Sequence, residues 1–207
     1  MAVPQPAAEV VALPRRERRK LELRARILEA ARALFDDQGF DATRVAEIAE
    51  RADVAEKTVF NHFATKQLMM RELAYEAIAA LVERVEQVRR EPGTTRERLA
   101  RFFEQVADAA EEGGPTHREL LTETIHALHD ARDESEQVKR LHDAFAGIVG
   151  DGVARGEITR AHAPETLANA ILGSFYSLMF SWAHVEGFPV REQARATARF
   201  LADALAA

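Results

Sequence analysis

Residues 44–63, RVAEIAERADVAEKTVFNHF, decide the fold. They contain two short helical patterns separated by Ala52-Asp53-Val54, and two short helices joined by a turn of three or four residues are typical of a helix-turn-helix. Val59 is predicted to face the core, so that its neighbours point outward. A helix of seven or eight residues fits the major groove of DNA, where such side chains can touch base edges and phosphates. The stretch therefore predicts a DNA-binding motif.

Helical patterns continue on both sides of this motif. Upstream, apolar residues recur on one face over 18–37, and Gly39 ends that helix. Thr43 is predicted to cap the first helix of the motif, and Thr65 the long helix that follows it. Downstream, breakers and apolar periodicity predict further helices over 95–112, 116–130, 135–153, 164–186 and 191–205. The sequence thus predicts an all-α protein of about nine helices, preceded by a disordered tail over 1–14.

The composition excludes several classes of function. With no cysteine, the chain cannot form disulfides, zinc-thiolate sites, iron–sulfur clusters or a thiol nucleophile. No apolar run approaches 18 residues, and the start of the chain lacks a secretory pattern, so we predict a cytoplasmic protein with no membrane partner. Neither a glycine-rich phosphate loop nor a Gly-x-Ser-x-Gly elbow is present. We therefore expect no enzymatic activity and no cofactor.

The charge is unevenly distributed. The chain carries a net charge of −6, yet residues 15–26 hold seven basic and two acidic side chains. Residues 28–66 hold five basic and eight acidic side chains, so the motif itself lies in a slightly acidic segment. The basic stretch must therefore supply much of any attraction to phosphate, unless it is simply a solvated tail.

With its flanks, the motif resembles the DNA-binding domain of the TetR (tetracycline repressor) family over roughly residues 20–80. The resemblance rests on Gly39-Phe40, Thr43, Ile48-Ala49, the run Thr58-Val59-Phe60-Asn61-His62-Phe63, and Lys66. It implies a three-helix DNA-binding domain over 15–66 and a helical effector-binding and dimerisation domain over 67–207. The candidate DNA contacts are Thr43, Arg44, Ala55, Glu56, Lys57, Thr58, Phe60, Asn61, His62, Lys66, Arg15, Arg16, Arg18 and Arg19.

Three positions depart from the family pattern, and Glu56 adds a negative charge beside them. Asp53 stands where many relatives have glycine, and aspartate tolerates the left-handed backbone. Ala55 replaces a serine that would cap the helix, and Phe60 replaces a tyrosine whose hydroxyl would reach phosphate. Glu56 suits the start of a helix but repels phosphate. These departures leave open a second hypothesis, a helical protein that binds small molecules or docks a partner with a weakened DNA-binding motif.

The helix predicted over 164–186 is apolar around most of its circumference, so it must bury more than one face. One face can meet the core and the other a second subunit. The resemblance also implies a homodimer, and a dimer would read two half-sites of a palindromic operator. We predict an interface that includes Gly173, Tyr176, Ser177 and Phe180.

Apolar and aromatic residues on several C-terminal helices can form either the core or an effector pocket. The candidate pocket residues are Leu99, Phe102, Phe103, Val106, Ile125, Phe145, Phe175 and Met179. His126 and His129 are three apart on one predicted helix with Glu123 before them, a spacing that can hold a metal, but no second matching motif is present. We therefore predict no metal site.

The sequence accordingly favours a ligand-responsive regulator, most simply a repressor that an apolar or aromatic small molecule releases from double-stranded DNA. A constitutive DNA-binding protein without an effector is a third hypothesis.

Overall fold

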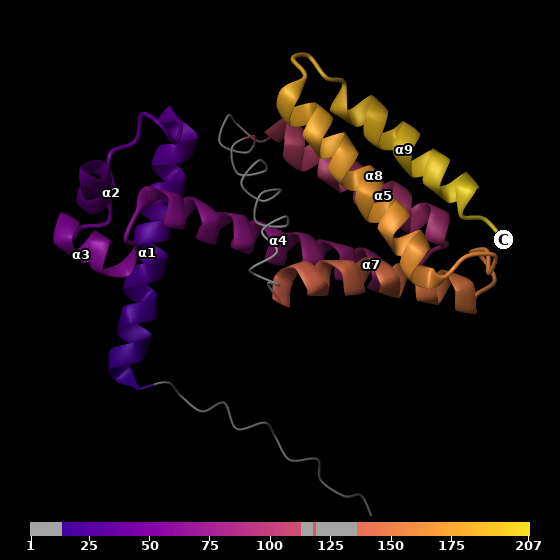
Figure 1. Ribbon diagram of the computed structural model, residues 1–207, viewed down its shortest axis with the longest axis horizontal. Helices are drawn as coiled ribbons and strands as arrows, with labels where there is room; N and C mark the ends of the chain where they lie inside the picture. The colour runs from indigo at the N-terminus through magenta and orange to yellow at the C-terminus, as the bar shows by residue number, and fades with distance from the viewer. Residues whose placement is uncertain (1–13, 113–117, 119–135) are drawn as a thin grey trace, which may run out of the picture.

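The computed structural model describes residues 14–112, 118 and 136–207. Eight helices occupy these ranges (Figure 1), and short loops join them except between Glu112 and Glu136, where the structure describes only Arg118. They are α1 (Arg15–Gln38), α2 (Val45–Arg51), α3 (Glu56–His62), α4 (Lys66–Arg90), α5 (Thr95–Glu112), α7 (Glu136–Ala154), α8 (Pro164–His184) and α9 (Val190–Ala204). The described residues contain no β-strand beyond one isolated bridge, so the all-α prediction is confirmed. Apart from Arg118, the helix predicted over 116–130 lies outside the described residues, as do residues 1–13 of the predicted tail.

Two hydrophobic cores organise the described residues, and α4 takes part in both. Ile27, Phe35, Ile48 and Val59 bring α1, α2 and α3 together, and α4 adds its first turns to this core as far as Leu73. From Ile78 onward, α4 packs with the C-terminal helices. Figure 1 shows α4 running from one group of helices to the other. Because α4 is continuous, the predicted domain boundary at residue 66 falls at its start and remains a prediction.

The second core is a helical bundle in which α5 packs on α9, and α7 packs on both α4 and α8. Phe102 lies at its centre, with ring centroids 5.2 Å from Phe103, 5.2 Å from Phe145 and 5.8 Å from Phe175. Edge-on and tilted contacts of this kind stabilise aromatic clusters beyond their buried area. None of the described helices is both long and apolar enough to cross a membrane.

The predicted helix caps agree with the structure at Thr65 and differ from it at Thr43. The Thr65 hydroxyl accepts a hydrogen bond from the Leu68 N–H at 3.2 Å, which confirms the predicted cap of α4. Thr43, however, does not cap α2, because its hydroxyl donates to the Gly39 carbonyl at 2.7 Å. The Glu47 carboxylate instead accepts from the Arg44 N–H at 2.8 Å, so the side chain that satisfies this helix start comes from inside the helix.

The first helix begins at Arg15, three residues before the predicted start. The segment contains good helix formers without glycine or proline, and the Arg18 N–H donates to the Pro14 carbonyl at 3.0 Å. Arg15 and Arg16, which lie before the predicted helix, are therefore helical as well. Figure 1 shows this end of α1 projecting beyond α2 and α3.

Candidate nucleic-acid interface

The turn between α2 and α3 fixes how the second helix of the motif is presented. Asp53 has a φ of 52°, the left-handed conformation expected for this position. The Val54 N–H donates to the Ala49 carbonyl at 3.0 Å, which closes the turn. Val59 is fully buried and Phe63 is 2% exposed, so both residues anchor α3 on the first core. The opposite face of α3 is therefore held toward solvent.

Most of the predicted contacts on α3 lie on that outward face. Lys57, Phe60 and Asn61 are exposed, and Phe60 keeps 47% of its surface in contact with solvent. Ala55 and Glu56 are also exposed at the start of the helix, where no side chain caps the backbone. The helix thus offers a cation, an amide and an aromatic ring to a groove, as the motif predicts. Their contacts with DNA remain a prediction.

Thr58 and His62 are half-buried. Burial, followed by the nearby charges of Arg24 and Lys20, lowers the pKa of His62 below its usual value of 6.5. In the free protein this shift favours the neutral imidazole at pH 7.

Two residues predicted as DNA contacts use their side chains for hydrogen bonds within the protein. Thr43 is only 2% exposed, so its side chain is not available to DNA. The Lys66 ammonium donates to the carbonyls of Phe40, Asp41 and Thr43, and lies 4.3 Å from the centre of the Phe40 ring. These three acceptors use all three of its N–H groups. We therefore correct both assignments, because Lys66 holds the α1–α2 loop and Thr43 fastens that loop to Gly39.

Arg44 can still reach a DNA phosphate although its side chain forms an ion pair with Glu47. Its guanidinium lies 2.8 Å from Glu47, yet 76% of its side chain is exposed. The Arg44 N–H, the Arg44 side chain and Gln38 together lower the pKa of Glu47 to about 2. An exposed ion pair of this kind is weak and can exchange for a phosphate contact.

Arg24 is a positioning residue that the sequence patterns did not single out. Its guanidinium donates to the His62 carbonyl at 2.8 Å, contacts Glu72 at 2.9 Å and lies 4.0 Å from the centre of the Phe63 ring. These contacts join α1 to the end of α3 and to α4. A single arginine in a basic stretch gives no local signal of such a role.

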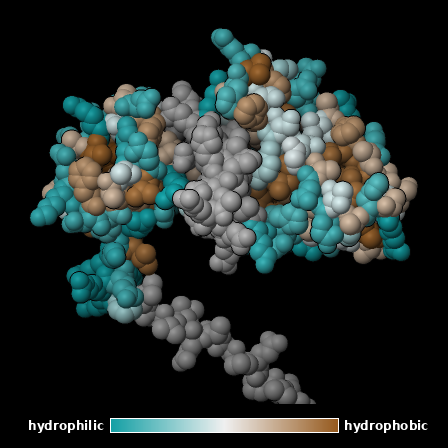
Figure 2. Space-filling view, viewed as in Figure 1, coloured by the Kyte–Doolittle hydropathy of each residue, from teal (hydrophilic) through white to brown (hydrophobic). Residues whose placement is uncertain are grey.

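The other basic side chains of α1 stay exposed. Arg15, Arg16, Arg18, Arg19 and Lys20 all face solvent on the projecting part of the helix. Arg18 lies 3.8 Å from Glu22, an exposed pair that neutralises little of the charge. Figure 2 shows hydrophilic residues gathered on this end of α1. The helix therefore presents a positive surface beside the α2–α3 motif.

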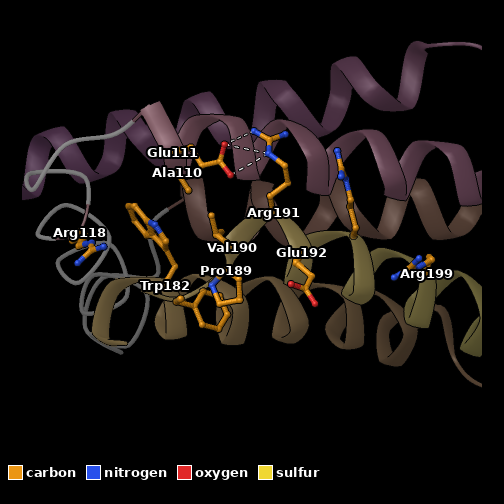
Figure 3. A pocket seen from close by; sticks show the side chains of 11 residues that line it. Ala110, Glu111, Arg118, Trp182, Pro189, Val190, Arg191, Glu192 and Arg199 are labelled. Carbon is orange, nitrogen blue, oxygen red and sulfur yellow. Dashed lines mark hydrogen bonds and ion pairs between the residues drawn. The ribbon is translucent and has the colours of Figure 1, made fainter. Parts of the chain in front are cut away.

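The predicted effector-pocket residues are packed as core. Leu99, Phe102, Phe103, Val106, Phe145, Phe175 and Met179 are all buried, with exposures of 0–6%, and Ile125 lies outside the described residues. Leu99 also borders a cavity of about 310 Å³ near the C-terminus. A larger cavity, of about 670 Å³, lies where α5, α8 and the start of α9 meet (Figure 3), and none of the predicted residues lines it. The aromatic residues fill the bundle because they contact one another, which corrects their assignment as pocket walls.

The predicted dimer face is mostly exposed. Gly173, Ser177 and Phe180 recur on one side of α8, and Phe180 is 53% exposed. Tyr176 is half-buried against Phe175, with ring centroids 5.6 Å apart, and burial raises its pKa to about 12. Phe200 on α9, which the sequence did not single out, is 66% exposed. An exposed row of small and aromatic residues suits contact with a second subunit, and this interface remains a prediction.

No group of three or more His, Asp or Glu side chains suited to a metal ion occurs in the part of the chain that the structure describes. Glu123, His126 and His129 lie outside that part.

Replacing Lys57 or Asn61 with alanine should have different effects on DNA binding. Asn61 can pair with an adenine edge, so Asn61→Ala should relax base preference at one position of each half-site. If Lys57 contacts phosphate, Lys57→Ala should weaken all sequences about equally and reduce the salt dependence by about one unit. Salt titrations against a selected site and a scrambled duplex check both. Unchanged binding by both variants would place another surface in the groove.

Lys66→Met should destabilise the free protein. It removes a charged donor from three carbonyls, which should lower the free energy of unfolding by about 2 kcal/mol. Lys57→Met is the matched control, since Lys57 is exposed, and its stability should stay unchanged. Urea denaturation without DNA measures both variants. Normal stability together with lost DNA affinity in Lys66→Met would restore Lys66 as a DNA contact.

Comparison with known proteins also points to a DNA-binding regulator. The family model described as "Bacterial regulatory proteins, tetR family" matches residues 27–73. The chain is 30% identical to the HTH-type transcriptional activator FasR of Mycolicibacterium smegmatis over 156 residues, 75% of this chain and 68% of that protein. It is 24% identical to the fatty acid metabolism regulator protein of Bacillus subtilis over 160 residues, 75% of this chain and 81% of that protein.

A similar fold occurs in a solved structure of FadR from Thermus thermophilus, described as a TetR family transcriptional repressor in complex with lauroyl-CoA. The TM-score is 0.62 at 23% identity, and the match covers 86% of this chain and 92% of that one.

Proposed function

Because the chain belongs to the tetR family of bacterial regulatory proteins, and is thereby a ligand-responsive DNA-binding transcriptional regulator, we propose that α3 enters the major groove of its operator. The observation that carries this proposal is the outward face of α3, where Lys57, Phe60 and Asn61 are exposed while Val59 and Phe63 are buried. The protein acts as a homodimer, so two copies of α3 would read the two halves of a palindrome. In this proposal residues 15–66 bind DNA, and residues 67–207 bind the effector and form the dimer.

The exposed end of α1 supports the same proposal electrostatically. The segment over 28–66 is slightly acidic, so α3 alone attracts phosphate poorly. The positive surface of α1 lies on the same domain and can neutralise phosphates beside the groove. The proposed site therefore combines α3 for sequence recognition and α1 for affinity.

We further propose that the protein is a repressor and that an effector with an apolar group releases it. The support is that one similar protein is named for fatty acid metabolism and that another was solved with lauroyl-CoA. FasR is named as an activator, so the direction of control is itself part of the proposal. We expect the protein to work in the cytoplasm, beside its DNA, and without catalysis.

The second candidate is a helical ligand-binding or partner-docking protein whose DNA affinity has been lost. Three features favour this candidate: the net negative charge over 28–66, the absence of a side-chain cap at Ala55, and the exposed ring of Phe60. Retention on random duplex DNA discriminates the two, because a working regulator binds duplexes non-specifically with a steep salt dependence.

Deleting residues 1–19 should lower operator affinity tenfold or more and leave the fold intact. The deletion removes four exposed arginines, and none of the residues of either core. Each lost phosphate contact reduces the salt slope by about 0.9, so the slope should fall by roughly two to three units while base preference barely changes.

The measurement is a salt titration of operator binding with full-length and shortened protein. Equal slopes would contradict a DNA-binding role for this end of α1.

A further inference from the structure

The cavity of about 670 Å³ between α5, α8 and α9 has a size typical of a small-molecule site. One part of its wall is apolar and comes from Ala110 on α5, Trp182 on α8, and Phe188, Pro189 and Val190 at the start of α9. Another part is charged and contains three arginines of α9, Arg191, Arg195 and Arg199, beside the carboxylates of Glu111 and Glu192. Figure 3 shows Trp182 and Val190 on one side of the view and Arg199 well apart from them. The wall thus offers an apolar surface and a cationic surface to one occupant.

The arginines of this wall differ in how far they are already paired. Arg191 contacts Glu104 at 2.6 Å, Asp108 at 2.8 Å and Glu111 at 2.6 Å, so acidic residues of α5 surround it. Arg195 contacts Glu104 at 2.8 Å. Arg199 is exposed and makes no ion pair or hydrogen bond with the part of the chain that the structure describes. Its charge is available to a ligand.

The same network keeps the cavity in shape. Arg191 and Arg195 join the first two turns of α9 to three carboxylates on α5, and α5 and α9 pack along each other. Arg118 lies 5.5 Å from the centre of the Trp182 ring, a distance at which a cation is attracted to an aromatic face. These pairs hold α9 against α5 beside the cavity.

We infer that this cavity binds an amphipathic anion, with its apolar group against Trp182, Phe188 and Val190 and its acidic group near Arg195 and Arg199. The inference rests on the proposed function, because it names the effector class and the site through which the regulator would respond. A neutral apolar molecule would leave the cation of Arg199 unused, and a purely polar anion would leave the apolar wall bare. The acidic group can be the carboxylate of a free fatty acid or the phosphates of an acyl thioester.

The protein carries its own reporter, because Trp182 is the single tryptophan of the chain and lines the cavity. Laurate, lauroyl-CoA and coenzyme A are titrated separately into the full-length protein while tryptophan fluorescence is recorded. Saturable quenching or a spectral shift with laurate or lauroyl-CoA is the expected result, and it identifies which acidic group the site accepts. Coenzyme A, which lacks the chain, should bind at least tenfold more weakly than lauroyl-CoA if the thioester is accepted. No saturable change with either chain-bearing probe would overturn the inference.

Three charge variants test the position of the acidic group. Arg199→Gln should weaken binding of the better probe about tenfold, because it removes an exposed cation without breaking any described pair. Glu192→Gln should tighten binding two- to threefold, because it removes an anion from the same wall. Arg160→Gln is the matched control, an exposed arginine in the loop before α8 that lines neither cavity described above. Equal affinities in all three variants would place the ligand elsewhere.

Operator binding separates the inference from the proposed function. If the full-length protein binds duplex DNA and lauroyl-CoA or laurate releases it, while Trp182 fluorescence and the Arg199→Gln variant show no effect, the regulator stands and this site is wrong. If the fluorescence and charge variants behave as expected but no duplex is bound, the site stands and the DNA-binding proposal fails. Arg199→Gln that binds operator normally and needs about ten times more ligand for release supports both.

Discussion

Phe180→Glu is expected to convert the dimer to monomers and to lower operator affinity at least a hundredfold. Phe180 is 53% exposed and lies in a row with Gly173 and Ser177 on α8, which we propose as the contact with the second subunit. A carboxylate placed in such an interface would be buried without a partner, and two of them would face each other across the two-fold axis. Because a monomer reads only one half-site, most of the affinity should disappear with the dimer.

The control for this substitution is Ala161→Glu, which adds the same charge at an exposed loop position. Light scattering gives the mass of each variant, and fluorescence anisotropy with a labelled operator gives the affinity. Phe180→Glu should keep its helical circular dichroism, since the side chain is not part of either core. A variant that is still dimeric at micromolar concentration would show that this row of α8 is not the interface.

Phe102→Ala is expected to lower the free energy of unfolding by about 3–5 kcal/mol. Phe102 is fully buried, and its ring contacts Phe103, Phe145 and Phe175. Its removal should leave a void that the surrounding helices fill only in part. In a protein of this size, each kcal/mol corresponds to roughly 2–4 °C in Tm, so the melting temperature should fall by about 6–20 °C.

The matched control is Phe188→Ala, because Phe188 is only half-buried, packs against the edge of the same core and lines the cavity. Its loss should cost clearly less stability, and thermal and urea denaturation compare the two variants. A Phe102→Ala protein with nearly unchanged stability but lost effector response would return Phe102 to the effector pocket, and the correction made above would be wrong.

Features that depend on a few neighbouring residues could be predicted from the sequence. The helical periodicity of the apolar positions predicts α1. The Thr65 cap and the left-handed backbone of Asp53 follow from the chemistry of single residues. The outward face of α3 follows in the same way once Val59 is assigned to the core. These features set the helix-turn-helix, which explains why the family was identifiable from about 60 residues.

Features that depend on distant residues could not be predicted. Lys66 binds carbonyls 23–26 positions earlier in the chain, and Arg191 contacts carboxylates 80–87 positions away. Neither pairing leaves a periodic pattern, so the sequence favours a DNA contact at Lys66 and gives no signal of the ion pairs between α5 and α9. The position of the cavity cannot be predicted for a related reason. Aromatic residues occur both in cores and in pockets. Only the packing of the helices shows that Phe102 lies inside the core and that Trp182 lines the cavity.

Selection of bound duplexes from a random pool tests the central claim most directly. The purified dimer is mixed with random duplexes, the bound fraction is amplified over several rounds, and the enriched sequences are aligned. We predict an inverted repeat whose half-sites lie about one helical turn apart, because two copies of α3 related by a two-fold axis would read it. Asn61→Ala should lose preference at one symmetric pair of positions in that repeat. A pool that stays random, or enriched sequences that Lys57→Ala and Asn61→Ala select and bind as the unaltered protein does, would contradict the claim that α3 reads DNA.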